Sequence, residues 1–210
     1  MSGHRLFAAV YDRMLAGQER AGLREMRAEL LAGARGRTLE LGAGTGLNLS
    51  HYSAQVTELV LTEPDPHMAK RLRRRLSEVE PEVRVEVVET GAEELPFPDA
   101  SFDSVVSTLV FCTVPDPEHA AAEASRVLKP DGRLLMIEHV RAEEGSTRAR
   151  WQDRLERPWG WVGAGCHPNR NTVATLSSRF DTSGLRDDTL PGPAPPIVKP
   201  LIRGAVRVRQ

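Results

Sequence analysis

The sequence predicts an α/β fold in which a mostly parallel β-sheet is covered by helices on both faces. Short apolar runs typical of buried strands alternate with segments whose apolar residues recur at three-and-four spacing, as in amphipathic helices. The run 134–137 is continuously apolar, as expected of a strand that is buried on both faces. The third observation is that the run 37–41 is followed directly by a turn that contains three glycines. This strand-and-turn unit is the feature around which we expect the fold to be organised.

Length and composition are those of one globular domain. The 210 residues are 40% apolar and 27% charged, so we expect a single domain over 1–210. The 28 basic and 29 acidic side chains leave a net charge of −1, which argues against nucleic acid as a partner. No apolar run approaches the roughly 18 to 20 residues of a membrane span, so we expect no transmembrane anchor. Two cysteines cannot form a disulfide framework and suit a reducing compartment, so we expect a cytoplasmic protein.

The first 34 residues are expected to form a helical N-terminal cap. Residues 6–16 and 17–32 each show apolar side chains at helical spacing, with Leu23 and Leu30 on the same side of the second segment. We expect these two helices to cover a ligand.

The glycine-rich turn after residues 37–41 is where we expect a cofactor. Gly42, Gly44 and Gly46 lack the side chains that would keep a ligand away from backbone N–H groups at the start of a following helix, which we expect from Leu47. An ordinary tight connection from strand to helix would use the same glycines, so the turn alone leaves both interpretations open.

An acidic residue ends the next expected strand. Glu63 lies twenty-one residues after Gly42 and directly follows the apolar run 59–62, where its carboxylate can accept both hydroxyls of a ribose. Leu47 occupies the position of the third glycine in the dinucleotide fingerprint. The pattern therefore favours an adenosine cofactor without a pyrophosphate, S-adenosylmethionine, and makes an NAD-dependent oxidoreductase the disfavoured alternative.

The remaining chain continues the alternation of helices and strands. Asp65 and Asp116 are each followed by a proline, which predicts an N-cap and a first helical residue, the second opening a helix through 128. A turn is expected at 130–132, and a last helix over 170–178 with Asn169 as its cap. The seven expected strands are 37–41, 59–62, 83–88, 102–108, 134–137, 180–190 and 201–208, of which the last two form an antiparallel pair.

The segment 140–169 is an insertion with more aromatic residues than a passive linker would carry. It holds Trp151, Trp159 and Trp161 together with Cys166. We expect it to form a lid over the substrate pocket.

Several motifs, each loose by itself, occur in the order found in one enzyme family. Together they resemble the class I S-adenosylmethionine-dependent methyltransferases of the methyltransferase type 11 group, which implies a Rossmann-like sheet. A narrower resemblance is to the methyltransferase-like thiol methyltransferases and their bacterial relatives. The first resemblance is carried by 40–46, Glu63, 91–97, 101–103 and 127–133, and the second by 46–49, Tyr52, 108–112, 138–140, 151–152, 158–159 and 165–166.

The resemblance implies that S-adenosylmethionine is the cofactor and suggests its contacts. Tyr11 matches a tyrosine that lies over the methionine part of the ligand in similar enzymes, although it could equally pack its helix against the core. Gly91 stands where the family usually has an aspartate for the adenine, which leaves that role to Ala92 and Glu93. The cofactor-binding residues expected on this basis are Tyr11, Glu40, Gly42, Ala43, Gly44, Asn48, Glu63, Pro64, Ala92, Glu93, Thr108 and Leu109.

The narrower resemblance implies methyl transfer to the sulfur of a small apolar thiol. The alternative is O-, N- or C-methylation of a quinone-like, lipid or natural-product acceptor. His139, which follows the strand 134–137, is the candidate catalytic base because imidazole titrates near neutral pH; His167 is the second candidate, and a purely structural histidine is the alternative. Cys112 and Cys166 lack the paired spacing of a zinc motif, so we expect no metal site.

Overall fold

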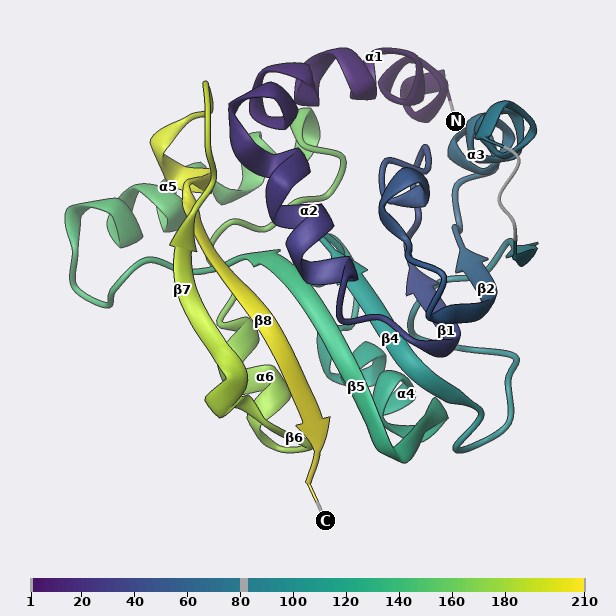
Figure 1. Ribbon diagram of the computed structural model, residues 1–210. Coiled ribbons are helices and arrows are strands. Elements are labelled where there is room, and N and C mark those ends of the chain that lie inside the picture. The colour runs from purple at the N-terminus through teal and green to yellow at the C-terminus, as the bar shows by residue number, and fades with distance from the viewer. Residues whose placement is uncertain (1, 80–82, 210) are drawn as a thin grey trace.

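A twisted β-sheet runs through the centre of the protein and is covered by helices on both sides (Figure 1). The computed structural model describes residues 2–79 and 83–209. Within these ranges the sheet has eight strands in the order β3-β2-β1-β4-β5-β8-β6, and β7 also pairs with β8. The strands are β1 Gly36–Leu41, β2 Val56–Thr62, β3 Arg84–Val88, β4 Phe102–Thr108, β5 Leu128–His139, β6 Phe180–Asp181, β7 Leu185–Thr189 and β8 Pro200–Val208.

The sheet divides into a parallel part and an antiparallel part, which confirms the predicted fold class. β1 to β5 pair in parallel, with β1 at the centre between β2 and β4. β8 then runs antiparallel to β5, β6 and β7. Since parallel strands end at one edge, the chain segments that follow β1, β2, β4 and β5 meet there.

The helices lie at the N-terminus and between the strands. α1 passes into α2 through a π-helical turn, Glu19–Leu23, where Gly22 has a φ of 130° and bends the axis. The helices are α1 Ser2–Gln18, α2 Arg24–Leu31, α3 Pro66–Val79, α4 Pro117–Val127, α5 Thr147–Val162 and α6 Thr172–Ser177. The predicted N-caps are confirmed, because Asp65 accepts from the N–H groups of His67 and Met68 and Asp116 accepts from that of His119. None of the helices in the described ranges combines the length and the apolar character needed to cross a bilayer.

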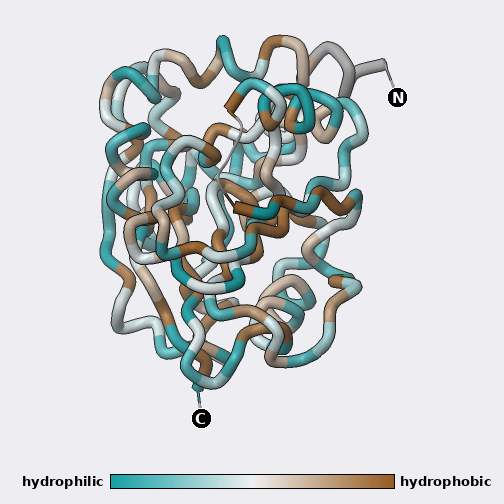
Figure 2. The backbone as a smooth tube through the Cα atoms, turned by 45° about the vertical axis from the view of Figure 1, so that its right-hand side comes forward, coloured by the Kyte–Doolittle hydropathy of each residue, from teal (hydrophilic) through white to brown (hydrophobic). Residues whose placement is uncertain are grey.

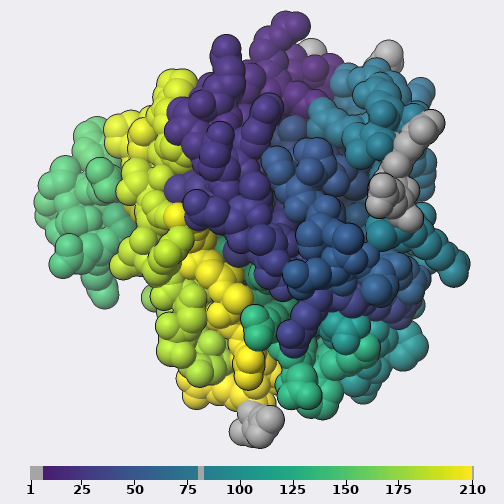
Figure 3. All heavy atoms as spheres, viewed as in Figure 1, coloured from purple at the N-terminus to yellow at the C-terminus, as the bar shows by residue number. Residues whose placement is uncertain are grey.

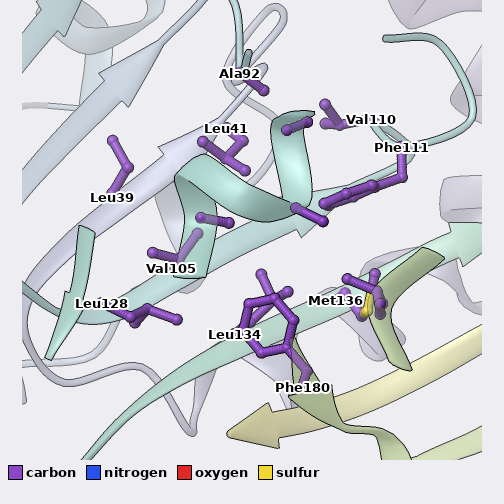
Figure 4. Packing of buried hydrophobic residues seen from close by; sticks show 14 of the residues in the cluster. Leu39, Leu41, Ala92, Val105, Val110, Phe111, Leu128, Leu134, Met136 and Phe180 are labelled. Atoms are coloured by element: carbon purple, nitrogen blue, oxygen red, sulfur yellow. The ribbon is translucent and has the colours of Figure 1, made fainter. Parts of the chain in front are cut away.

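Strand side chains alternate between two apolar cores, one on each face of the sheet. On one face Leu41 and Met136 pack with α4 and α6, and Figure 4 shows part of this cluster. On the other face Leu61 and Ile137 pack with side chains of α2 and α3. The hydropathy colouring of Figure 2 shows apolar stretches gathered in the interior.

The glycine turn does not lead into the helix that we expected from Leu47. A single 3-10 turn, Leu49–His51, follows instead. Gly42, Gly44 and Gly46 all have positive φ, so a right-handed helix cannot begin before Leu47, and the backbone is already extended at Tyr52. Only one tight turn fits between these two points.

Three further boundaries differ from the predictions. The expected strand 180–190 is broken by a 3-10 turn, Thr182–Gly184, which raises the strand number from seven to eight. Residues 130–132 lie within β5 as an excursion, since the register with β4 moves from Phe102↔Leu128 to Ser104↔Arg133. The cap of α6 is Asn171 because the helix begins only at Thr172, and Asn171 accepts from the N–H of Ala174; the amide of Asn169 instead donates to Asp153.

The segment that contains α5 projects from one side of the molecule (Figure 3). It is fixed at its base by Gln152, which is fully buried and whose side-chain Nε2 contacts the carbonyl oxygens of Val140, Pro168 and Ile197. Ala142 donates its N–H to the Oε1 of the same side chain. The expected lid is therefore anchored where β5 ends.

Candidate functional site

The glycine turn is held by the end of β2. Ala43 donates its N–H to the carbonyl oxygen of Thr62 at 2.8 Å. Glycine is required at position 46, where φ is 84° and an added Cβ would lie 2.8 Å from side-chain carbons of Leu49 and Leu72. The turn is thus a rigid element on which a ligand can rest.

Glu63 lies against this turn and is the best-positioned predicted residue. Its Oε2 accepts from the N–H of Gly44 at 2.8 Å, and its Oε1 accepts from the N–H of Asp65 at 2.9 Å. Burial raises the pKa of Glu63, while the two backbone donors oppose that shift. The carboxylate retains lone pairs, so it can accept the hydroxyl groups of a ribose.

A buried polar network lies beneath the turn and connects it to the N-terminal helices. The amide of Asn48 donates from Nδ2 to Glu40 at 2.9 Å, and its Oδ1 accepts from Arg27 at 2.9 Å. Arg27 in turn donates to Glu19 at 3.0 Å, and Tyr52 donates to the second oxygen of Glu40 at 2.7 Å. Burial raises the pKa of Glu40 to about 7. Arg27 lies on α2, and no pattern in the sequence singles it out as a site residue.

Tyr11 is placed over the glycine turn by α1. A Cβ built on Gly44 would lie 3.9 Å from a ring carbon of Tyr11. The next residue, Asp12, accepts from the hydroxyl of Thr45 at 2.5 Å and pairs with Arg75 of α3 at 2.6 Å. Burial raises the pKa of Tyr11 to about 12. α1 therefore contacts the glycine turn through both of these side chains.

The other expected cofactor contacts line the same edge of the sheet. Thr108 ends β4, and its hydroxyl accepts from Asn48 at 3.1 Å. Leu109 follows with a φ of 60°, an uncommon backbone conformation for a residue with a branched side chain. Ala92 is buried in the loop after β3, and the carboxylate of Glu93 lies 3.4 Å from the backbone nitrogen of Asp116. Pro64 is exposed and directly follows Glu63.

His139 lies at the end of β5, between the two cysteines of the chain. Its Nδ1 is 3.7 Å from the sulfur of Cys112 and 3.7 Å from that of Cys166, and all three side chains are buried. The hydrogen bond between the thiols lowers the pKa of Cys166 and raises that of Cys112, since one proton is shared. The three residues are far apart in the sequence. The fold brings them together, because Cys112 follows β4, His139 ends β5 and Cys166 lies in the insertion.

Two further observations concern the histidine candidates and a neighbouring acid. His167 directs its Nδ1 to Glu156 at 2.7 Å, within the insertion. Glu138 was not predicted as a site residue, yet it is fully buried, accepts from the Ser107 hydroxyl at 2.6 Å and has a pKa raised by burial to about 7.

Of the three tryptophans in the insertion, one faces inward. Trp159 packs against the core, and its indole nitrogen is buried without a hydrogen-bond partner among the described residues. Trp151 is 49% exposed and Trp161 is 89% exposed. The aromatic character of the insertion therefore lies partly on its outer surface.

A glycine turn after the central parallel strand, a buried acid at the end of the next strand and a tyrosine beside the turn form the arrangement in which Rossmann-like folds bind nucleoside cofactors. Comparison with known proteins agrees: the methyltransferase domain family matches residues 39–136. The chain belongs to the class I S-adenosylmethionine-dependent methyltransferases.

The similar curated proteins include thiol methyltransferases. Thiol S-methyltransferase TMT1A of Homo sapiens is 30% identical over 203 residues, which cover 94% of this chain and 81% of that protein. Thiol S-methyltransferase TMT1B of Homo sapiens is 38% identical over 154 residues, which cover 70% of this chain and 62% of that protein. A phosphatidylethanolamine N-methyltransferase of Cereibacter sphaeroides is 34% identical over 60% of this chain and 63% of its own length. The chain thus spans less than two thirds of the TMT1B and Cereibacter proteins.

The fold is also found in solved structures. A methyltransferase from Thermotoga maritima, described as a possible histamine N-methyltransferase, has a TM-score of 0.66 and 22% identity, covering 99% of this chain and 97% of that one. At this level of identity the similarity concerns the fold.

Proposed function

We propose that the protein transfers a methyl group from S-adenosylmethionine to the sulfur of a small apolar thiol. The observation that carries this proposal is the similarity to thiol S-methyltransferase TMT1A along 94% of the chain. That alignment reaches beyond the cofactor-binding half, whereas the match to the N-methyltransferase covers 60% of the chain. The alignment with TMT1A includes the segment after β5, and this segment places Cys166 next to His139, where we propose that the acceptor binds.

The proposal assigns the cofactor a place along the ends of β1, β2 and β4. Its ribose hydroxyls would be accepted by Glu63, and its amino-acid end would lie over Gly44 under the ring of Tyr11. The adenine would lie against Ala92 and Glu93 in the loop after β3. The sulfonium would then face the chain that follows Thr108, towards Cys112 and His139.

Methyl transfer from a sulfonium requires alignment more than bond activation. The leaving group is already charged, so the acceptor sulfur has only to be held in line with the methyl group while water is kept out. A thiol with a pKa near ~8.5 is partly ionised at neutral pH, and a group that takes up its proton increases the fraction of thiolate. In the simplest form of the proposal that group is His139, whose Nε2 is buried and has no hydrogen-bond partner among the described residues.

We also propose that the insertion 140–169 forms the lid of the acceptor pocket. Its anchor at Gln152 fixes its base next to the end of β5. The N–H of His167 donates to the carbonyl oxygen of Cys112 at 2.7 Å, which joins the end of the insertion to the loop after β4. An acceptor bound at His139 would thus lie between these two segments.

The experiment that tests the proposal is a methylation assay with S-adenosylmethionine and matched apolar thiols, phenols and amines. We expect S-adenosylhomocysteine and a methyl thioether to form together from the thiols, as identified by mass spectrometry. The matched control replaces each thiol by its oxygen analogue, which keeps size and shape. Methylation of phenols or amines with unreactive thiols would contradict the proposal and favour the O- or N-methylation alternative.

A further inference from the structure

The cluster of Cys112, His139 and Cys166 unites side chains from three separate parts of the chain. Cys112 lies in the turn after β4, His139 ends β5 and Cys166 lies at the end of the insertion after α5. They are 1%, 9% and 5% exposed. Their potential ligand atoms, two sulfurs and one imidazole nitrogen, all lie within 4.8 Å of one another.

These distances fit tetrahedral coordination of one metal ion. With zinc–sulfur bonds of about 2.3 Å and zinc–nitrogen bonds of about 2.05 Å, neighbouring ligand atoms are roughly 3.6 Å apart in a tetrahedron. Both sulfurs lie 3.7 Å from the Nδ1 of His139. The two sulfurs lie within 4.8 Å of each other, so a metal ion could be bound if they moved by no more than about 1 Å.

The surroundings hold the three ligands in place. The guanidinium of Arg170 donates to the carbonyl oxygens of Phe111 and Val114 at 2.6 Å each, which fixes the turn that carries Cys112. His139 is paired with Leu201 of β8. Ligands on rigid elements form a prepared site rather than a chance approach of flexible side chains.

Charge also favours a bound cation. Both cysteines are free and buried, and burying a thiolate without a partner is costly. Two thiolates and a neutral imidazole would balance a divalent ion in full. Soft sulfur ligands combined with an imidazole are the donor set that selects zinc, whereas magnesium and calcium prefer oxygen ligands.

We propose that Cys112, His139 and Cys166 bind one zinc ion and that its fourth position binds the sulfur of the acceptor. Within residues 2–79 and 83–209 no other histidine, cysteine or carboxylate belongs to the cluster. Catalytic zinc sites have three protein ligands and one open position, whereas structural sites have four protein ligands.

The chemistry at such a site is balanced without another reactant. The acceptor thiol replaces a water on the zinc ion and loses its proton to solvent, so that it binds as a thiolate. The zinc-bound sulfur attacks the methyl carbon of S-adenosylmethionine, and the carbon–sulfonium bond breaks with its electron pair going to the departing sulfur. The products are S-adenosylhomocysteine and a neutral thioether, which is a weaker zinc ligand and leaves.

The location of the cluster agrees with this role. Cys112 follows β4 and His139 ends β5, so the cluster lies at the same edge of the parallel strands as Thr108, whose hydroxyl bonds to Asn48 beneath the glycine turn. The inference rests on the proposed thiol methylation and replaces one part of it. A histidine whose Nδ1 binds zinc is a ligand, so the zinc ion, and not His139 as a base, would produce the thiolate.

The test measures metal first and activity second. The full chain, expressed with added zinc and freed of any affinity tag, is analysed by elemental mass spectrometry, and we expect about one zinc per chain. Cobalt substitution should give a thiolate-to-cobalt charge-transfer band. Cys112→Ser and Cys166→Ser should each weaken zinc binding by more than about 100-fold, since even a lost outer-sphere contact costs 10- to 100-fold. His119→Ala, which removes an exposed histidine, is the matched control and should retain the metal.

Binding of S-adenosylhomocysteine by calorimetry shows that each variant is folded. The zinc site is overturned if the protein given zinc or cobalt contains none, or if mass spectrometry finds a Cys112–Cys166 disulfide in the active enzyme. If thiol methylation continues after complete removal of zinc, the zinc ion does not bind the acceptor, but the proposed thiol methylation is still supported. A stoichiometric zinc ion with no thiol methylated would instead refute the proposed function and, with it, the role of the fourth position.

Discussion

Replacing Glu63 by glutamine tests the ribose contact that positions the cofactor. The carboxylate of Glu63 accepts one backbone N–H on each oxygen, from Gly44 and from Asp65. An amide keeps the size of the side chain but has one oxygen, so its NH₂ group must face one of these donors. Glu63→Gln therefore disturbs the turn and removes one charged acceptor for a ribose hydroxyl.

The magnitude follows from the hydrogen bonds affected. A hydrogen bond to a charged group contributes about 1.5 to 3 kcal/mol, and 1.4 kcal/mol is a factor of ten in affinity. The loss of one such bond, with the other weakened, gives about 2 to 3 kcal/mol, or roughly 30- to 140-fold weaker binding of S-adenosylhomocysteine. Isothermal titration calorimetry measures this change directly.

Glu89→Gln is the matched control for this experiment. Glu89 directly follows β3 and pairs with Arg73, and both side chains are nearly half exposed. The control should bind S-adenosylhomocysteine like the unchanged protein, because exposed ion pairs contribute little. If Glu63→Gln bound the ligand within about twofold of the unchanged protein, the assignment of the ribose to this side chain would be refuted.

Three further predictions concern the residues around the cofactor site. Burial raises the pKa of Glu40 from 4.5 to about 7, so between these pH values the folded protein keeps this proton while the unfolded chain loses it, and the free energy of unfolding falls as the pH rises and then levels off. Glu40→Gln should remove up to about 3 kcal/mol of this pH dependence, measured by urea unfolding. Equal pH dependence of stability in both proteins would contradict the assignment. Arg27→Met should lower the free energy of unfolding by about 3 to 5 kcal/mol, because the buried carboxylate of Glu19 loses its partner, and adding Glu19→Gln should restore part of the loss. Gly46→Ala should lower the melting temperature and weaken cofactor binding, because residue 46 has a left-handed φ and an added Cβ would lie too close to its neighbours. Gly160→Ala is the control, since a Cβ added there has no atom within 4 Å, and it should change neither quantity. Similar effects of both substitutions would count against a strained turn.

The parallel half of the fold could be predicted because its signals are local. An apolar run followed by Gly42 or Glu63 marks the end of a buried strand, and Asp116 before a proline marks the start of a helix. Such signals depend on a few neighbouring residues, so they can be recognised in the sequence without the tertiary structure. The same argument explains why Glu63 and the glycine turn were found together.

The features that escaped prediction depend on contacts between distant segments. The amide of Asn169 donates to Asp153, sixteen residues earlier, and α6 begins only at Thr172, where Asn171 accepts from the N–H of Ala174. Cys166 reaches His139 only because the insertion is anchored at Gln152. Spacing along the chain cannot reveal such a cluster, and it was the absence of paired spacing that led us to expect no metal there.

The account depends most directly on where the cofactor lies. A crystal structure with S-adenosylhomocysteine measures this, and we predict ribose hydroxyls within hydrogen-bonding distance of Glu63, the amino-acid end over Gly44 and the sulfur facing Cys112 and His139. A ligand bound elsewhere, or one whose sulfur faces away from these two side chains, would contradict the account.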